Sequence, residues 1–213
     1  MIKLIVFDMD GVLTEEKSSW HYVHQRLGLD NSENFRKYAD NEITYDEFFK
    51  LDLKLWLNKF DKLKKDVIVD ILREIKIRDG LKDVIEYLHR HNIKSVIVSG
   101  GISWLSDIIM ARYHFDRAYA NEIFTDESNN ILPYGRINVV PDKKNIVIKN
   151  IIKEYNVDSS SVLSIGDSKT DYSMYIASEY FIAFNSDDDF IKKISDYSIN
   201  NDITKIIDFL NSY

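Results

Sequence analysis

Short apolar runs that end in polar turns recur along the chain at residues 2–7, 94–98, 162–165 and 180–184. They are rich in β-branched residues and too short for helices, which predicts strands that are buried on both faces. A fifth, shorter strand is expected near residues 118–120. These runs therefore indicate a central sheet.

Amphipathic helical patterns separate these runs, at residues 81–90, 146–155 and 203–210. In the first pattern, apolar side chains return at the spacing of one helix face, at Leu81, Val84, Ile85 and Leu88. Strands that alternate with such helices predict an α/β fold, with a Rossmann-like parallel sheet core and helices on both faces. In a sheet of this kind, ligands bind beyond the carboxyl ends of the strands.

Two segments interrupt the alternation. Residues 15–78 carry helical patterns but no run typical of a buried strand, so we predict a small helical cap inserted after the first strand. This assigns residues 1–14 and 79–213 to the core. Residues 122–138 hold two short extended runs around a polar turn at residues 126–130, a pattern that predicts a β-hairpin.

Composition narrows the classes of partner. The chain has 213 residues and a formal net charge of −7, and no Lys/Arg cluster stands clear of neighbouring acidic residues. A basic surface is what binds nucleic acid or an anionic membrane, so we expect neither as a partner. The chain has no cysteine, which excludes disulfides, thiolate metal sites and a cysteine nucleophile.

The apolar segments are all short. The first stops at Asp8, which is too early for the apolar region of a signal peptide, and no run approaches the length of a membrane span. We therefore expect a cytoplasmic protein. No apolar stripe stands apart from the core pattern, so the sequence assigns no oligomeric state.

Acidic residues gather where strands end. Asp8 and Asp10 follow the first strand, and Asp167 and Asp171 follow the strand at residues 162–165. The carboxyl ends of parallel strands meet at one edge, so these carboxylates would repel each other unless a hard cation lies among them. Oxygen ligands in this arrangement suit Mg²⁺, which commonly shares a phosphate oxygen.

Phosphate-binding groups are expected at the same edge. Ser99 is followed by Gly100 and Gly101, whose backbone amides can approach an anion closely. Lys144 lies in the first turn of a helix, and we favour it over Lys143, which lies one step around from the buried stripe. A lysine, a hydroxyl and free amides suit phosphate oxygens, and the set indicates phosphoryl transfer.

Four groups in this order resemble the four motifs of the haloacid dehalogenase superfamily phosphatases: Asp8-Met9-Asp10-Gly11-Val12, Ser99, Lys144, and Gly166-Asp167-Ser168-Lys169-Thr170-Asp171. Within that superfamily the chain is most similar to the phosphoserine phosphatase group, whose second motif resembles Val98-Ser99-Gly100-Gly101. The resemblance spans the whole chain, and the helical insertion falls where that group has its first cap.

The resemblance implies roles for three acidic residues. Asp8 attacks phosphorus and becomes an aspartyl phosphate. Asp10 protonates the leaving oxygen and later activates the hydrolytic water. Mg²⁺ is held by the Asp8 carboxylate, the Asp10 backbone carbonyl and the Asp167 carboxylate, together with the substrate.

It also implies how the phosphate is held. Ser99, the Gly100 amide and Lys144 bind the phosphate oxygens, and Asp171 orients Lys144 or a metal-bound water. The activity implied is a magnesium-dependent phosphatase that hydrolyses a small phosphomonoester.

Two other activities use similar residues. A phosphotransferase or phosphomutase on the same scaffold would pass the phosphoryl group from Asp8 to a sugar, and release of inorganic phosphate without an acceptor would distinguish hydrolysis from it. A phospho-accepting regulatory domain also uses an Asp and Mg²⁺ on a parallel sheet. Asp10 and the cap argue against that domain, since it has no leaving group to protonate.

The cap gives a hypothesis about substrate. Phosphoserine phosphatases use a cap Glu to meet the substrate ammonium and a cap Arg to meet its carboxylate. Counting along this chain places Lys17 and Lys50 at these positions, although Glu15 and Glu16 lie beside the first. We therefore expect phosphoserine to be a poor substrate, and an oxygen-rich leaving group, as in a phosphorylated sugar or acid, to be favoured.

Three further features have structural interpretations. His21 and His24 lie three apart without an apparent third metal ligand, so we expect exposed helix histidines. Trp56 lies in an apolar stretch and is expected to pack inside the cap. Residues 187–189 are three aspartates that we expect to cap a helix beginning near Phe190.

Overall fold

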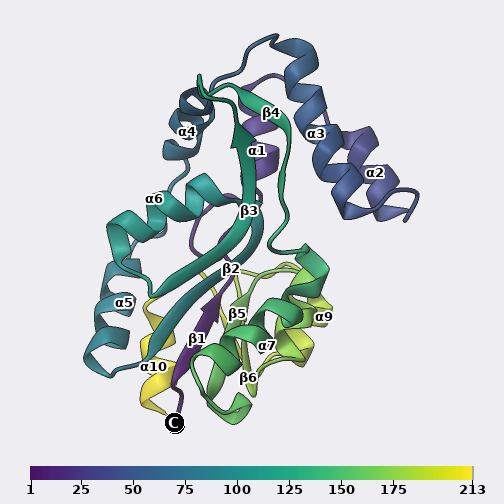
Figure 1. Ribbon diagram of the computed structural model, residues 1–213. Coiled ribbons are helices and arrows are strands. Elements are labelled where there is room, and N and C mark those ends of the chain that lie inside the picture. The colour runs from purple at the N-terminus through teal and green to yellow at the C-terminus, as the bar shows by residue number, and fades with distance from the viewer. Residues whose placement is uncertain (213) are drawn as a thin grey trace.

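A seven-stranded sheet lies at the centre of the computed structural model, which describes residues 1–212 (Figure 1). Its strands are β1 (Leu4–Phe7), β2 (Lys94–Ile102), β3 (Arg117–Thr125), β4 (Ile131–Arg136), β5 (Val162–Gly166), β6 (Tyr180–Phe184) and β7 (Tyr197–Ile199). The spatial order is β4-β3-β2-β1-β5-β6-β7, and every neighbouring pair is parallel except β3 and β4.

Helices cover both faces of this sheet (Figure 1). One group is α5 (Leu81–Arg90), α6 (Ser103–Tyr113) and α10 (Lys205–Asn211), and the other is α7 (Lys144–Glu154), α8 (Tyr172–Tyr175) and α9 (Asp189–Ile194). Single-turn 3₁₀ helices are η1 (Pro141–Lys143), η2 (Ser159–Ser161) and η3 (Lys169–Asp171). None of the described helices has both the length and the apolar character needed to cross a membrane.

The residues of β1 alternate between the two faces, as the two-residue period of a strand requires. Ile5 and Phe7 lie in one buried cluster with residues of α5, and Leu4 and Val6 lie in a second cluster with residues of α7. All four side chains are fully buried. The expected α/β fold with helices on both faces is therefore confirmed.

Residues between β1 and α5 form four helices, α1 (Ser19–Arg26), α2 (Ser32–Ala39), α3 (Tyr45–Lys59) and α4 (Lys65–Arg73). They lie beyond the carboxyl end of the sheet (Figure 1). Ser18 begins α1, where its hydroxyl accepts the amide of His21. Thr44 and Glu47 begin α3 with a capping box, in which each side chain bonds the other residue's backbone amide.

A hairpin joins the sheet to these helices. β3 continues past β2 and pairs antiparallel with β4, which confirms the expected hairpin. β4 packs against α3, and an isolated bridge joins Lys64 to Asn130 at the turn. The division expected from the sequence placed this hairpin with the core, yet in space it also reaches the helices of residues 15–78 (Figure 1).

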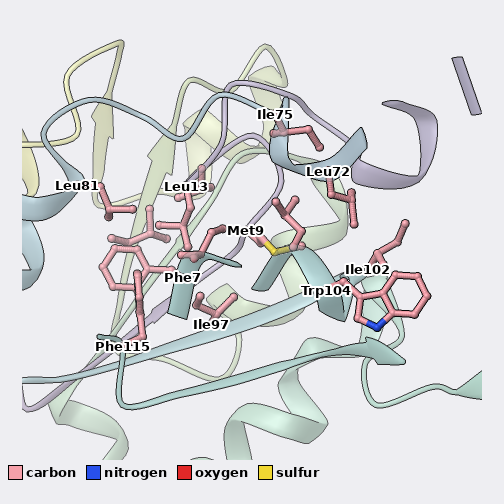
Figure 2. Packing of buried hydrophobic residues seen from close by; sticks show 14 of the residues in the cluster. Phe7, Met9, Leu13, Leu72, Ile75, Leu81, Ile97, Ile102, Trp104 and Phe115 are labelled. Atoms are coloured by element: carbon pink, nitrogen blue, oxygen red, sulfur yellow. The ribbon is translucent and has the colours of Figure 1, made fainter. Parts of the chain in front are cut away.

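The hydrophobic core is continuous from the sheet into these helices (Figure 2). Phe7 of β1 meets Phe115 edge to face, with ring centroids 5.6 Å apart. From there Met9 and Leu13 lead to residues of α4 and the segment after it, among them Leu72. One buried cluster thus anchors α4 to the sheet.

Two strands differ from the sequence expectation. β2 runs on through Ser99, Gly100 and Gly101 to Ile102, where a turn was expected, and its pairing with β3 shifts register after Val98. β7 was missed, because three residues are too few to show a period.

Two smaller expectations have clear outcomes. The helix cap is confirmed, since Asp188 accepts the amides of Phe190 and Ile191 at the start of α9. The expectation that His24 is exposed was wrong, because its side chain is buried against Trp56 and Asp52. Trp56 is fully buried, as expected.

Candidate active site

The predicted catalytic residues and the residues expected to hold the phosphate and the metal lie at the carboxyl ends of β1, β2 and β5 and at the start of α7, where they line part of a cavity of about 630 Å³. We call this part the floor; its residues are Asp8, Asp10, Ser99, Gly100, Lys144 and Asp167. Residues of α1, α2 and α3 line another part of the cavity. We call its aromatic residues the roof: Trp20, Phe35, Tyr38, Tyr45, Phe48 and Phe49.

Lys144 joins two carboxylates at the floor. It is the first residue of α7, and its Nζ lies 2.7 Å from Oδ1 of Asp8 and 2.7 Å from Oδ1 of Asp171. Burial alone lowers the pKa of a lysine, but these two carboxylates outweigh it and raise the pKa of Lys144 above its ordinary value. The lysine therefore stays charged while almost fully buried.

Asp171 is held by donors on both of its oxygens. Its Oδ1 accepts from Lys144, and its Oδ2 accepts the amides of Asp167 at 2.9 Å and Ser168 at 3.1 Å. The residue is fully buried in η3. Asp171 therefore fixes both the lysine and the turn that carries Asp167.

Asp8 follows directly from β1. Its Oδ1 accepts the amide of Met9 at 2.8 Å as well as the Lys144 ammonium. Among residues 1–212, no donor reaches its Oδ2. Burial raises the pKa of Asp8 despite the opposing charge of Lys144, and the carboxylates of Asp171 and Asp167 raise it further.

Asp10 has one oxygen bonded and one without a partner. Its Oδ2 accepts the hydroxyl of Ser19 at 2.8 Å, whereas its Oδ1 is buried with no hydrogen-bond partner among the described residues. Burial raises the pKa of Asp10, although the bonds from Ser19 oppose the rise. A carboxyl in this setting holds a proton readily and has an oxygen directed to no protein group, which suits proton transfer to a ligand.

The acidic residues fit a divalent cation. Oxygens of Asp8, Asp167 and Asp171 all lie within 4.8 Å of one another, and all three side chains are buried. Burial, reinforced by the charge of Asp171, raises the pKa of Asp167 to about 7. Because Asp171 already accepts from Lys144 and two amides, the Asp8 and Asp167 carboxylates are the two left for a metal, and oxygen donors of this kind suit Mg²⁺.

Two glycines allow the strand ends to approach one another. Gly11 has a φ of +77°, and a Cβ there would collide with the Asp167 carboxylate. A Cβ on Gly101 would lie 2.6 Å from Oδ2 of Asp10 and 2.7 Å from Oγ of Ser19. A side chain at either position would therefore displace an acidic residue of the floor, Asp167 at Gly11 and Asp10 at Gly101.

The segment with Ser99 and Gly100 is tied to the insertion. Ser99 is buried, and its Oγ accepts the amide of Gly101 at 3.0 Å. The carbonyl oxygen of Gly100 accepts from Trp20 Nε1 at 3.2 Å and from the Tyr45 hydroxyl at 3.1 Å. Two roof residues are thus fastened to the strand end where we expect phosphate to bind.

Asn121 completes this junction, although no sequence pattern pointed to it. Its Nδ2 donates to the Gly100 carbonyl, the Tyr45 hydroxyl and the Val139 carbonyl at 2.9–3.0 Å. Its Oδ1 accepts the amides of Asn138 and Val139. The side chain is fully buried. A lone asparagine just after the short strand expected near residues 118–120 carries no motif, so only the fold reveals this role.

The two cap lysines lie in different places. Lys17 borders the cavity and pairs with Asp187, and both side chains are exposed. Lys50 is not among the residues that line the cavity; it pairs with Asp46 on the outer side of α3 at 2.6 Å. The geometry therefore gives no support to a substrate role for Lys50.

The position of Lys50 follows from helical spacing. The residues of α3 that line the cavity are Tyr45, Phe48, Phe49 and Asp52, which recur at the spacing of a single helix face. Glu15 pairs with Lys76, and neither Glu15 nor Glu16 borders the cavity.

Solved structures with similar folds include phosphoserine phosphatases. The chain matches a phosphoserine phosphatase with a phospho-aspartyl intermediate analogue at a TM-score of 0.80 and 19% identity, covering 98% of both chains. It matches a substrate-bound phosphoserine phosphatase at a TM-score of 0.81 and 18% identity, with the same coverage. These similarities confirm the fold.

Curated relatives carry the same name. A phosphoserine phosphatase of Archaeoglobus fulgidus is 26% identical over 204 residues, which are 94% of this chain but 57% of that protein. One of Idiomarina loihiensis is 24% identical over 212 residues, covering 96% of this chain and 91% of that protein. One of Haemophilus influenzae is 23% identical over 139 residues, 65% of this chain and 44% of that protein. The chain thus matches about half the length of two of these relatives.

A family model described as haloacid dehalogenase-like hydrolase matches residues 2–178, a range that includes every residue of the floor. The expected order of motifs, their meeting at one sheet edge and this match all agree, and the chain belongs to the haloacid dehalogenase-like hydrolase family.

Proposed function

We propose that the chain hydrolyses a small phosphomonoester through an aspartyl phosphate on Asp8. The observation that carries the proposal is the pairing of two buried carboxyls with different surroundings. Asp8 is held by Lys144, whereas Asp10, beside the same cavity, has one oxygen with no hydrogen-bond partner among residues 1–212. Groups with contrasting environments suit a nucleophile and an acid–base residue.

The first step forms a bond between a carboxylate oxygen of Asp8 and phosphorus. Lys144 and the Met9 amide both donate to Oδ1 and hold the carboxylate at the phosphate site. The bond from phosphorus to the alcohol oxygen breaks, and that oxygen takes the proton of Asp10 as the alcohol leaves. Ser99, the Gly100 amide and Lys144 hold the phosphate oxygens.

The second step returns the enzyme to its starting state. Asp10, now a carboxylate, takes a proton from a water molecule whose oxygen attacks phosphorus. The bond from phosphorus to Asp8 breaks, and inorganic phosphate is released. Ser19 holds Asp10 in both steps through its hydroxyl.

Mg²⁺ would be held by the Asp8 and Asp167 carboxylates and by the Asp10 backbone carbonyl. Its charge would offset the repulsion between these carboxylates and the phosphate. Asp171 supports the arrangement by fixing Lys144 and the backbone of Asp167.

The test is a screen of phosphorylated small molecules with the full chain and Mg²⁺, measuring inorganic phosphate with no acceptor present. We expect phosphate release that stops in excess chelator and returns when Mg²⁺ is restored. Full activity in chelator would contradict the proposed metal site. Transfer that needs an added sugar acceptor would show a phosphotransferase in place of a hydrolase.

A further inference from the structure

The cavity above the floor has an aromatic wall. All six members of the roof come from α1, α2 and α3, and several pack on one another. Tyr38 and Phe48 are stacked, with ring centroids 5.2 Å apart and planes 4° from parallel. Tyr45 meets Tyr38 at 5.5 Å, and Phe35 meets Phe48 at 6.4 Å. A leaving group attached to a phosphate on the floor would therefore extend against rings.

The polar atoms of two roof residues are already engaged. Trp20 Nε1 donates to the Gly100 carbonyl, and the Tyr45 hydroxyl donates to the same oxygen while accepting from Asn121. Phe35, Phe48 and Phe49 have no polar side-chain atoms. What the roof has left to offer a ligand is therefore mainly ring surface.

Both lysines that line the cavity are already paired with carboxylates. Of its two lysines, Lys144 lies between Asp8 and Asp171, and Lys17 pairs with Asp187. No arginine borders the cavity among the described residues.

Outside the floor, the lining of the cavity includes two acidic residues, Asp30 and Asp52. Oxygens of Asp52 accept from Asn31 and Asn34, and its Oδ2 lies 3.7 Å from Nε2 of the buried His24, so its partners are already in place. A carboxylate on the leaving group would enter between acidic side chains without a free cationic partner.

We propose that the substrate is a phosphomonoester whose leaving group carries a flat apolar ring and no carboxylate. The inference rests on the function proposed for the floor. It assigns to the roof the selectivity for the alcohol that leaves from the phosphomonoester. An aromatic ring binds a second ring by offset stacking or by edge contact, and both arrangements exclude water from the ring surfaces. This replaces the expectation, based on Lys17 and Lys50, that the leaving group is rich in oxygen.

The experiment compares alkyl phosphates, so that the acidity of the leaving group stays nearly constant. 2-Phenylethyl phosphate, propyl phosphate, phosphoserine and glucose 6-phosphate are assayed with the full chain and Mg²⁺. We expect kcat/KM for the phenylethyl ester to exceed that for the propyl ester by about 10- to 100-fold, the factor that corresponds to burying one phenyl group. Phosphoserine and glucose 6-phosphate are expected to fall below the phenylethyl ester.

A variant pair locates the preference. Phe48→Ala removes a ring that stacks on Tyr38 at the cavity, and we expect it to lower the ratio of phenylethyl to propyl ester by about 3- to 10-fold. Tyr134→Ala removes an exposed ring of β4 that does not border the cavity, and the ratio should stay as in the wild type. A ratio unchanged by Phe48→Ala would place the preference elsewhere and overturn the assignment.

A binding measurement separates this inference from the proposed function. 2-Phenylethylphosphonate and propylphosphonate cannot be hydrolysed, and calorimetry gives their affinities whether or not the chain turns over any ester. Tighter binding of the phenylethyl compound supports the aromatic site even if no ester is hydrolysed, which would sink only the proposed function. Equal binding of the two, or phosphoserine as the best substrate of the panel, overturns the inference.

Discussion

The floor and the roof of one cavity are built on opposite principles. In the floor, Lys144 and Asp8 are buried and joined by a short charged contact, and Lys144 makes a second such contact with the buried Asp171. In the roof, Phe35 is more than half exposed and Phe48 is partly exposed, and the contacts are between rings. Buried charges tolerate few arrangements, whereas apolar rings tolerate many. With the roles proposed for floor and roof, the reaction and the choice of substrate are set by separate parts of the chain.

The largest effect is expected at the floor. Asp8→Asn replaces the attacking carboxylate with an amide, and turnover should fall by about 10⁴- to 10⁶-fold, as for other nucleophile losses. Phosphate release measures the rate, and mass spectrometry of quenched wild-type protein should detect one added phosphate that the variant lacks. Asp70→Asn, at an exposed position of α4 that does not border the cavity, is the control. An Asp8→Asn protein that keeps wild-type activity would refute the assignment of Asp8 as the nucleophile.

The next effect separates the acid from the nucleophile. Asp10→Asn should lower kcat on alkyl phosphates by about 10²- to 10⁴-fold, because their leaving group needs a proton. On p-nitrophenyl phosphate the loss should be smaller, provided that formation of the aspartyl phosphate limits the rate. Rapid-quench measurements of the first turnover meet that condition, and equal losses on both esters in that measurement would argue against Asp10 as the acid.

A third substitution removes contacts at the junction between floor and roof. Asn121→Ala removes a buried side chain that bonds the Gly100 carbonyl, the Tyr45 hydroxyl and the backbone near Val139. Groups left without partners should lower the free energy of unfolding by about 2–4 kcal/mol, measured in urea. Asn150→Ala, at an exposed position of α7, is the matched control. A loss of unfolding free energy no greater than that of the control would show that the junction contributes little to the stability of the fold.

The buried pair behind the roof should respond to pH. Burial lowers the pKa of His24 below its ordinary 6.5, while the carboxylate of Asp52 and the bond to the Trp20 carbonyl oppose the shift and His21 adds to it. The unfolded state therefore binds a proton at a higher pH than the folded state, and His24 makes stability fall as the pH drops below about 6.5. Asp52, whose pKa burial raises, gives the opposite slope above its ordinary value of 3.8.

Asp52→Asn removes both the counter-charge of His24 and this opposing slope. We expect the variant to lose about 1–2 kcal/mol more than the wild type between about pH 6.5 and pH 5, within the limit of about 1.4 kcal/mol per pH unit for one proton. Urea unfolding at both pH values measures this, and Asp46→Asn on the exposed side of α3 is the control. Parallel pH curves for the wild type and Asp52→Asn would contradict the coupling.

The smallest effect is expected at Lys50. Lys50→Ala breaks only an exposed pair with Asp46, so stability should change by less than about 0.5 kcal/mol. The kcat/KM values for phosphoserine and for the phenylethyl ester should both stay as in the wild type. A change in the ratio of these two kcat/KM values would mean that Lys50 contacts the substrate, which would contradict its position on the surface outside the roof.

The sequence predicted the floor better than the roof for a physical reason. Asp8 and Asp167 follow strands directly, and Lys144 begins a helix, so their positions depend on local patterns and on how parallel strands align. Lys50 was assigned by counting along the chain, and counting does not say which face of a helix a residue occupies. The face of α3 that holds Tyr45 and Asp52 became evident only once the helix was packed.

Two other differences have the same origin. His24 belongs to a short polar helix whose pattern gives no inner face, and its burial depends on α3 lying alongside. Asn121 lies in a strand, but its partners come from Gly100, Tyr45 and the segment after β4. Contacts between segments far apart in the chain leave no periodic trace in the sequence.

The continuous core bears on how such a protein can change its substrate. Because Met9 and Leu13 share one cluster with Leu72 and Ile75 (Figure 2), a chimera that exchanges residues 15–78 as a unit would cut through packed side chains. The faces of α2 and α3 that carry Phe35, Tyr38 and Phe48 lie outside that seam and are partly exposed. Point substitutions there are the route by which evolution, or a directed library, can diversify the alcohol without rebuilding the chemistry.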